Sequence, residues 1–244
     1  MNKRILLLAF FLSTSIFIYA QPEYAIGIKG GLNYYTIGDI NSRGGSIQSG
    51  KPDEVFTPNK EMGTQFGVFL NVAFDKFFIR PELNFVTNKN TYDFPNRTSH
   101  WKASKVDFPI LFGYKIYDPV SIYVGPSFSF FNDMTLEGAN NITSANSIDY
   151  EKTTSNFIVG IQVEFKRFGV DLRYESGFKE TIGEHTNNYQ DFQNSAFGIN
   201  LGDIYSYKPS QISLSLNIFL FRTDGAEIGN IFKGWGGDKC KCPY

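Results

Sequence analysis

The sequence predicts an all-β fold, an eight-stranded antiparallel up-and-down β-barrel that spans a membrane. Three observations lead to this prediction: long segments alternate apolar and polar residues, short and long connections alternate between them, and the chain begins with an apparent export signal. The 244 residues are enough for one barrel domain. The 25 Phe, 14 Tyr and 23 Gly favour strands and turns over helices.

Residues 1–20 have the features of a secretory signal peptide. Lys3 and Arg4 form a positive start, residues 5–18 form an apolar run, and residues 19–21 offer a cleavage point. The run is shorter than the roughly 20 residues that a transmembrane helix needs. We therefore expect an exported chain, with an uncleaved membrane anchor as the alternative.

Eight segments alternate apolar and polar residues along the chain from residue 21 to residue 222. In the last of them, Ile212, Leu214 and Leu216 face one way, while Ser213 and Ser215 face the other. The segments are longer than the usual strand of about 5 to 6 residues and match tilted membrane-spanning strands of about 9 to 11 or more. They lie at about 23–36, 63–75, 77–88, 104–117, 119–131, 155–166, 169–179 and 210–222.

The connections between these segments differ in length in a regular way. Three are short turns, at residues 75–76, 117–119 and 166–168, and between them lie long polar stretches. The long stretches are residues 37–62, 89–103, 132–154 and 180–209. This alternation is typical of an up-and-down barrel with short periplasmic turns and long extracellular loops.

The composition of the two faces indicates which of them meets lipid. A soluble barrel or sandwich with a solvated polar face would alternate in the same way, but the many large apolar residues would overfill an eight-strand interior. We therefore expect the apolar face to contact lipid and the charged face to line the lumen, where opposite charges can pair. The expected lumen ion-pair network consists of Lys29, Arg80, Glu82, Asp107, Lys115, Glu164, Asp171, Arg173 and Glu175.

Prolines and aromatic residues add expectations about local geometry. Pro81, Pro109 and Pro126 lack a ladder donor, so they are expected to mark bends or bulges. By strict alternation Phe221 points inward, and a bulge near residue 219 would turn it outward. Aromatic residues near strand ends are expected to form girdles at the membrane surfaces. These are Tyr24, Tyr34, Tyr92, Trp101, Tyr117, Tyr123 and Tyr174.

Two stretches, IRPELNF (79–85) and KVDFPILFGYKIYDPVSIYVGPSFSF (105–130), resemble the PorT-like outer-membrane β-barrel family of Bacteroidetes. The Gly-rich GIKGGLNYY (27–35) is similar to the first strand of that family. The resemblance implies a barrel in the outer membrane, and some relatives serve the type IX secretion apparatus. It rests on Arg80, Glu82 and Leu83; on Pro109, Tyr114 and Lys115; and on Tyr123, Gly125 and Pro126.

Several function classes receive little support from the sequence. The net charge of −1 gives no indication of a nucleic-acid partner. His100 and His185, both expected in long loops, show no spacing that secures a nucleophile and base, so we expect no catalytic site, no metal and no cofactor. A lipid-modifying hydrolase that uses these histidines, or a narrow passive channel, remains the alternative. An eight-stranded barrel leaves essentially no channel.

The C-terminal segment, residues 223–244, is expected to form a periplasmic tail. Its candidate partner-binding residues are Ile228, Ile231, Phe232, Trp235, Cys240 and Cys242. The two cysteines are too close for an easy mutual disulfide and too few for a zinc site, so a bond to a partner protein is one hypothesis. A disordered tail is the alternative. The sequence as a whole predicts a non-enzymatic accessory subunit that contacts outer-membrane lipid and docks a partner complex.

Overall fold

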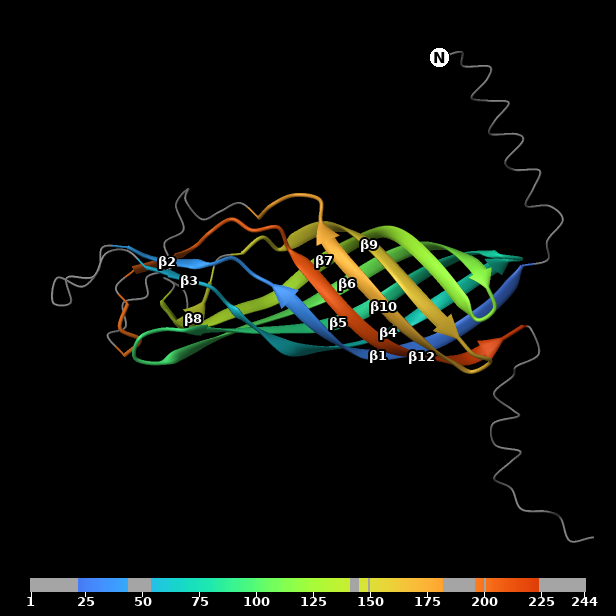
Figure 1. Ribbon diagram of the computed structural model, residues 1–244, viewed down its shortest axis with the longest axis horizontal. Helices are drawn as coiled ribbons and strands as arrows, with labels where there is room; N and C mark the ends of the chain where they lie inside the picture. The colour runs from blue at the N-terminus through green and yellow to red at the C-terminus, as the bar shows by residue number, and fades with distance from the viewer. Residues whose placement is uncertain are drawn as a thin grey trace, which may run out of the picture.

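In a computed structural model of the chain, the described residues are 22–43, 54–140, 145–148, 150–181, 196–199 and 201–223. Their strands form one closed barrel and a smaller sheet beyond its end (Figure 1). The barrel strands are β1 (Glu23–Thr36), β4 (Asn59–Phe74), β5 (Phe77–Asp93), β6 (Thr98–Tyr117), β7 (Val120–Asn140), β9 (Thr153–Glu164), β10 (Phe168–Gly177) and β12 (Ser210–Arg222). The remaining strands are β2 (Ile40–Arg43), β3 (Val55–Phe56), β8 (Ala145–Ser147) and β11 (Leu201–Ile204).

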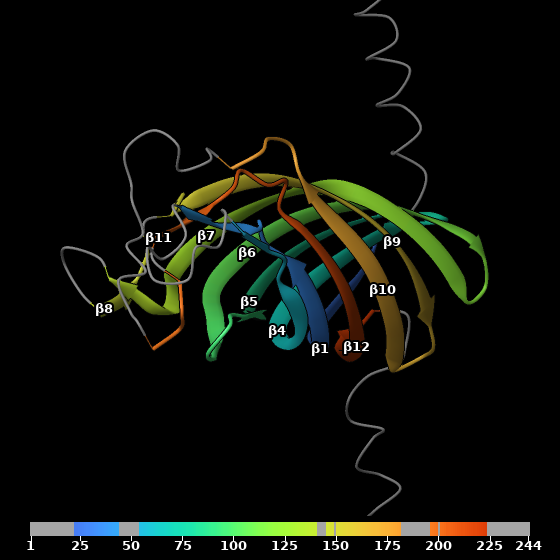
Figure 2. The same cartoon turned by 60° about the vertical axis from the view of Figure 1, so that its left-hand side comes forward.

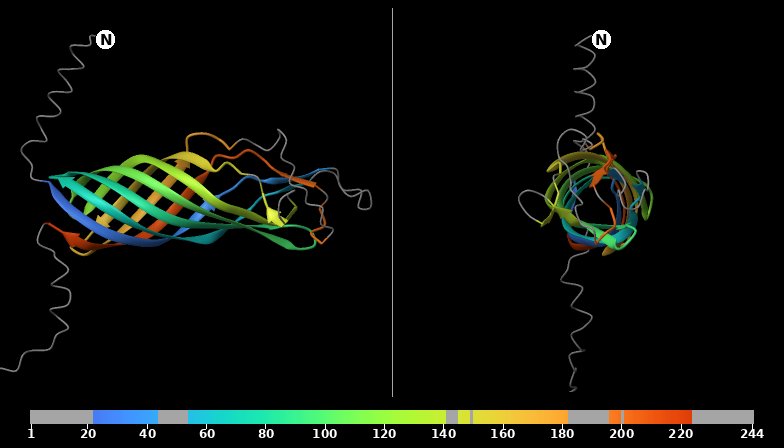
Figure 3. Two further views of the ribbon diagram at one scale, coloured as in Figure 1. Left: turned by 180° about the vertical axis from the view of Figure 1, so that it is seen from behind. Right: turned by 90° about the vertical axis from the view of Figure 1, so that its left-hand side faces the viewer.

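The eight barrel strands pair antiparallel with their neighbours in the chain. β6 pairs with β7, and β1 pairs with β12, so the ring closes without a free edge. The end-on view in Figure 3 shows this ring. The predicted eight-stranded up-and-down barrel is therefore confirmed, and each predicted segment corresponds to one strand of the ring. The predicted bounds of the first and last segments agree with β1 and β12.

Short turns gather at one end of the barrel. They connect β4 to β5 at residues 75–76, β6 to β7 at 118–119 and β9 to β10 at 165–167. The start of β1 and the end of β12 lie at this same end (Figure 1). In an outer-membrane barrel this end is periplasmic, so the opposite end faces outward.

At the outward end, β-strands occupy much of the sequence that its polar composition predicts as loops. β5 and β6 continue to residues 93 and 98, through most of the stretch that is predicted as a loop at 89–103. β7 likewise continues into the predicted loop at 132–154, and residues 37–62 contain β2, β3 and the start of β4. Beyond the ring, β2 pairs with both β3 and β11. Figure 2 shows β11 and β8 at this end of the molecule.

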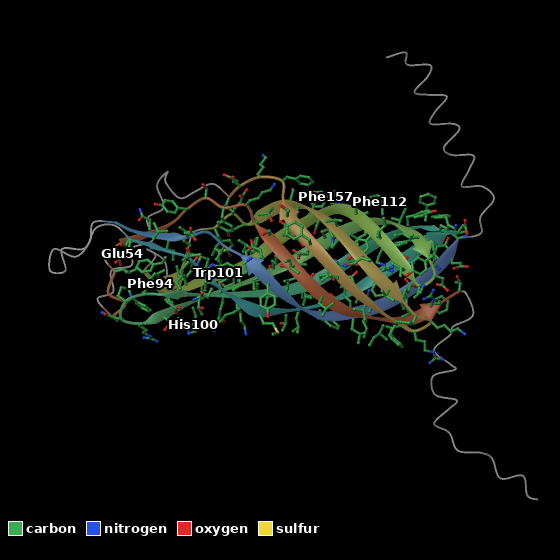
Figure 4. The ribbon with its side chains drawn as sticks, viewed as in Figure 1. Glu54, Phe94, His100, Trp101, Phe112 and Phe157 are labelled. Atoms are coloured by element: carbon green, nitrogen blue, oxygen red, sulfur yellow. The ribbon has the colours of Figure 1, made fainter. Side chains whose placement is uncertain are left out.

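The alternation places apolar side chains on the outside of the barrel. Phe112 and Phe157 are exposed, and Figure 4 shows them on the outer surface of the ring. On β12 every second residue from Ile212 to Leu220 is aliphatic and exposed, and the residues between them, from Ser213 to Phe219, are buried. The part of the chain that the structure describes contains no helix of the length and apolar character that a membrane span needs.

The ladder is irregular near the end of β12 and regular at the prolines. Ile26 pairs with Phe221 while Gly27 pairs with Phe219, so Leu220 is the extra residue of a bulge and Phe221 is exposed. The bulge expected near residue 219 is thereby confirmed. By contrast, the pairs at Pro81, Pro109 and Pro126 keep one register, so none of these prolines marks a bulge. A bend of the ladder at these prolines stays a prediction.

Candidate functional site

The centre of the lumen holds a compact group of charged side chains. Glu82 accepts hydrogen bonds from Lys29 Nζ at 3.1 Å and from the two terminal nitrogens of Arg173 at 3.0 and 3.1 Å. Asn84 Nδ2 donates to the same carboxylate at 3.0 Å. Arg173 Nε also donates to Asp171 Oδ1 at 3.0 Å. Two cations and two anions from three strands therefore balance one another.

Tyr123 connects this central group to β7. Its hydroxyl donates to Asp171 Oδ2 at 2.7 Å, and the Arg173 guanidinium lies 5.6 Å from its ring centre. Tyr123 and Asp171 are both fully buried. Tyr123 therefore fixes the positions of Asp171, through the hydrogen bond, and of Arg173, through the ring face, in addition to the attraction between their charges.

Arg80 belongs to a second group, nearer the periplasmic end. Its guanidinium lies between two rings, 5.0 Å from the centre of Phe69 and 5.1 Å from that of Phe78. It donates to Asn71 and Gln162, and it lies 3.5 Å from Glu164. A planar cation suits this position because it can stack on aromatic faces while its edge forms hydrogen bonds.

Glu164 also pairs with Arg222 at the periplasmic mouth, at 2.8 Å. Lys115 lies at the same mouth and lines a shallow pocket with Glu164 and Arg222. Among the described residues Lys115 forms no ion pair, so its expected place in the network is not found. The reason is local, because β6 is irregular between Lys115 and Tyr117 and ends there.

A third group lies toward the outer end of the lumen. Lys105 Nζ lies 3.0 Å from Asp107 and 3.2 Å from Glu175. Asn156 Nδ2 donates to Glu175 at 2.6 Å and to Ser129 at 2.8 Å. Lys105 is not among the residues predicted for this network. It shares the strand parity of Asp107, and this parity is the signal in the sequence that places it inside the barrel.

The three groups together make the described lumen nearly neutral. Their members are five cations and five anions: Lys29, Arg80, Lys105, Arg173 and Arg222 with Glu82, Asp107, Glu164, Asp171 and Glu175. Such pairing and hydrogen bonding is what buried charge requires. The chemical consequence is a filled and electrically balanced lumen.

Three aromatic side chains fit into this narrow lumen because each lies directly opposite a glycine on the neighbouring strand. The pairs are Phe69 with Gly27, Phe78 with Gly113, and Tyr123 with Gly160. A Cβ atom at any of these glycines would overlap the facing ring. The glycines therefore provide the space in which the rings lie, and the rings in turn hold Arg80 and Arg173.

Beyond the charged groups, the outward extension is filled by an apolar cluster. Trp101 and Tyr92 are fully buried, and the Trp101 ring stacks on Tyr35 with centres 5.6 Å apart. Figure 4 shows Trp101 and Phe94 within this extension. The cluster comprises Tyr35, Ile37, Ile40, Tyr92, Phe94, Trp101, Ala103, Phe131, Met134, Leu136, Ala139, Ile148, Phe197, Ile199 and Ile204.

The aromatic girdles that the sequence predicts are found only in part. Tyr92, Trp101 and Tyr123 point inward and are buried, so they do not contact the membrane surfaces. The other members of the expected girdles are exposed on the outside of the barrel. They are Tyr24, Tyr34, Tyr117 and Tyr174.

The remaining candidate residues do not assemble into a catalytic site in the part of the chain that the structure describes. His100 lies exposed on the outer part of β6, opposite Thr91, and the other histidine candidate, His185, lies outside the described residues. The tail candidates and both cysteines, residues 228–242, also lie outside them. No cluster of three metal-ligating side chains occurs among the described residues.

The closed ring, its apolar exterior and its charge-balanced interior define an integral membrane β-barrel with a filled lumen. A family model described as "Outer membrane protein beta-barrel domain" matches residues 19–183, more than half of the chain. The protein belongs to this family and lies in the outer membrane, where its exterior contacts lipid. The comparison with curated proteins found no match.

Solved structures of small barrels are similar to this chain at low sequence identity. Neisserial surface protein A is 10% identical, with a TM-score of 0.42 over 79% of this chain and 96% of its own. OprG from Pseudomonas aeruginosa is 13% identical, with a TM-score of 0.44 over 82% and 97%. Ail of Yersinia pestis, solved in complex with the heparin analogue sucrose octasulfate, is 13% identical, with a TM-score of 0.41 over 82% and 99%.

Proposed function

We propose that this barrel is a non-enzymatic structural or accessory subunit of the outer membrane that docks partner proteins. Within that role we place it with the PorT-like barrels of Bacteroidetes, in a secretion or outer-membrane assembly complex. The observation that carries the proposal is the filled lumen, with three ion-paired groups below an apolar outer cluster. A barrel with a filled lumen is suited to binding partner proteins on its surfaces rather than to transporting a solute through its lumen.

The two ends of the barrel supply the proposed docking surfaces. At the outer end, the extended strands β5, β6 and β7 and the small sheet of β2, β3 and β11 present a packed structure. At the inner end, β12 finishes at Arg222 beside the periplasmic mouth, so residues 224–244 begin on the periplasmic side. We propose that Ile228, Ile231, Phe232 and Trp235 contact the partner there, after removal of the signal peptide at residues 1–20.

Purification from native membranes in mild detergent tests this role. We expect a defined set of outer-membrane or periplasmic proteins to co-elute with the full chain and to be lost when residues 224–244 are deleted. A matched control carries the same tail residues in shuffled order and should also lose the partner. A partner retained by both variants would contradict the role of the tail, and an eluate without any enriched protein would contradict the docking role.

Cys240 and Cys242 make one form of this docking testable by electrophoresis. If they join a partner covalently, a band of higher apparent mass should appear without reductant and disappear with it. Cys240→Ser together with Cys242→Ser should abolish the band. An apparent mass that does not change on reduction would count against a covalent link while leaving non-covalent docking to the co-elution experiment.

A further inference from the structure

The outward face of β5 and β6 changes from apolar to basic within a few residues. Directly opposite pairs follow one another along the two strands toward the outer end: Phe85 with Val106, Thr87 with Ser104, and Lys89 with Lys102. These positions alternate with buried, inward-facing positions, and both lysines are exposed. Toward the outer end, one face of the strand pair therefore carries first apolar side chains, then hydroxyl groups and then ammonium groups.

Lys89 and Lys102 place two like charges directly opposite each other on one face of the strand pair. Like charges directly opposite each other in an antiparallel ladder are destabilising. Two acidic residues lie nearby. Glu61 on β4 is opposite Lys89, and Asp133 on β7 is opposite Ser104. Neither lysine forms an ion pair with any residue that the structure describes. The two ammonium groups are therefore available to an external anion.

The height of the lysines matches the headgroup layer of the outer leaflet. Four residues separate Phe85 from Lys89, roughly 13 Å along a strand. We take Phe85, the last exposed apolar residue of β5 before Lys89, as the edge of the hydrocarbon. At a strand tilt of about 45° the lysines then lie about 9 Å beyond this edge along the membrane normal. Below them the exposed rings of Phe108 and Phe130 pack edge to face, with centres 5.8 Å apart. An acyl chain can lie on these rings while its headgroup reaches the lysines.

We propose that Lys89 and Lys102 bind the phosphate of a lipid headgroup in the outer leaflet. The acyl chains of the same lipid lie against Phe85 and the Phe108–Phe130 pair. Lysine ammonium groups bind phosphate as point charges, and two of them on one face suit a phosphate monoester with nearly two negative charges. This lipid site is distinct from the docking of proteins, since it lies on the lipid-facing wall.

Native mass spectrometry of the detergent-purified barrel, titrated with diphosphoryl lipid A, tests the site. We expect the variant that combines Lys89→Gln with Lys102→Gln to bind the lipid roughly ten- to thirty-fold more weakly than the unchanged protein. The matched control combines Lys76→Gln with Lys166→Gln, which removes two exposed lysines from the periplasmic turns. This control should bind lipid A as the unchanged protein does.

Two further measurements separate the possible outcomes. Phosphatidylcholine has no net charge, so its binding should be the same in all three proteins. Millimolar inorganic phosphate should not displace lipid A, because it lacks the acyl chains; full displacement would mean an anion site and overturn the lipid assignment. Equal lipid A affinity in the Lys89/Lys102 variant and the unchanged protein would overturn the proposal, provided that the heat-dependent gel shift shows both barrels folded.

Discussion

Arg80 and Glu82 flank Pro81 on one strand, yet they belong to different ion-paired groups. Arg80 stacks between two rings and reaches Glu164 near the periplasmic mouth, while Glu82 pairs with Lys29 at the centre of the lumen. Pro81 lies between them on the outer face, where it is exposed toward lipid. The alternation of a single strand thus distributes charge over two levels of the lumen while keeping its apolar residues outside.

Glu82 is the residue whose charge the network needs most, because it accepts from both Lys29 and Arg173. Glu82→Gln would leave one buried cation in excess, and breaking a buried ion pair in this way costs about 3 to 5 kcal/mol. We expect a lower midpoint of urea unfolding in detergent micelles or lipid vesicles. Tryptophan fluorescence and the heat-dependent gel shift would report this change.

Glu164→Gln is the matched control for this prediction. Glu164 pairs with Arg80 and Arg222, but its side chain retains 14% exposure at the mouth, so water can replace part of the lost interaction. The variant should lose less stability than Glu82→Gln. Equal losses would contradict the view that the central group is the most desolvated part of the network.

Gly113 tests the pairing of rings with glycines. In Gly113→Ala the new methyl group would overlap the Phe78 ring, and overpacking of this kind costs about 1 to 3 kcal/mol. Gly30→Ala is the control, since a Cβ there meets no atom within 4 Å on the outer face. Gly30→Ala should be neutral or slightly stabilising, because glycine weakens a strand interior. The same unfolding measurement compares them, and equal effects would contradict the assignment.

At the scale of the elements, the sequence predicts the strands well in the membrane and poorly beyond it. Within the membrane the outward face must be apolar on every strand, so the alternation is continuous and identifies all eight. The bulge in β12 was also predictable, because Phe221 breaks the parity set by Ile212 to Ile218.

Above the membrane the same strands reverse their polarity. On β5 the inward positions carry Arg80 and Glu82 lower down but Tyr92 at the outer end, while the outward positions change from Phe85 to Lys89. A reversal of this kind interrupts the alternation, and the surrounding Asn, Ser and Thr residues then resemble a loop. The extension forms because its inward aromatic residues bury one another, which is a tertiary effect that the local pattern does not contain.

Trp101 tests whether the extension is a separately stabilised element. Trp101→Ala removes a fully buried ring that stacks on Tyr35, and the typical cost is about 3 to 5 kcal/mol. We expect faster amide exchange in the outer parts of β5, β6 and β7, with unchanged protection within the membrane. Hydrogen exchange read by mass spectrometry measures both regions.

His100→Ala is the control for the extension, because the side chain next to Trp101 points to the exposed face. Exchange should be unchanged in this variant. Faster exchange throughout the barrel in Trp101→Ala would contradict the separation, since it would mean that the outer cluster and the membrane-spanning ring unfold together.

At the scale of the whole molecule, the sequence predicts that charged residues line the lumen, but it does not predict how they pair. The parity of the strands assigned charged residues to the inside, but it could not decide which anion meets which cation. Glu82 meets Lys29 and Arg173, whereas Arg80 meets Glu164 rather than Asp107. These choices depend on the stagger of strands around the ring, which no single strand encodes.

The filled lumen leads to a final prediction about ion passage. Three groups of paired charges occupy successive levels, and the apolar cluster around Trp101 and Leu136 lies beyond the outer group. An ion crossing the lumen would have to break these pairs and then enter an apolar region without compensation, which is costly.

Planar bilayers containing the purified barrel should therefore show flat current traces under an applied voltage, while a 16-stranded porin inserted in parallel shows steps. The variant Glu82→Gln should remain silent as well, because the other two groups and the apolar cluster still fill the path. Reproducible single-channel steps in the unchanged protein would contradict the filled lumen. Steps that appear only in Glu82→Gln would instead identify the central group as the sole barrier and show that the outer cluster does not seal the barrel.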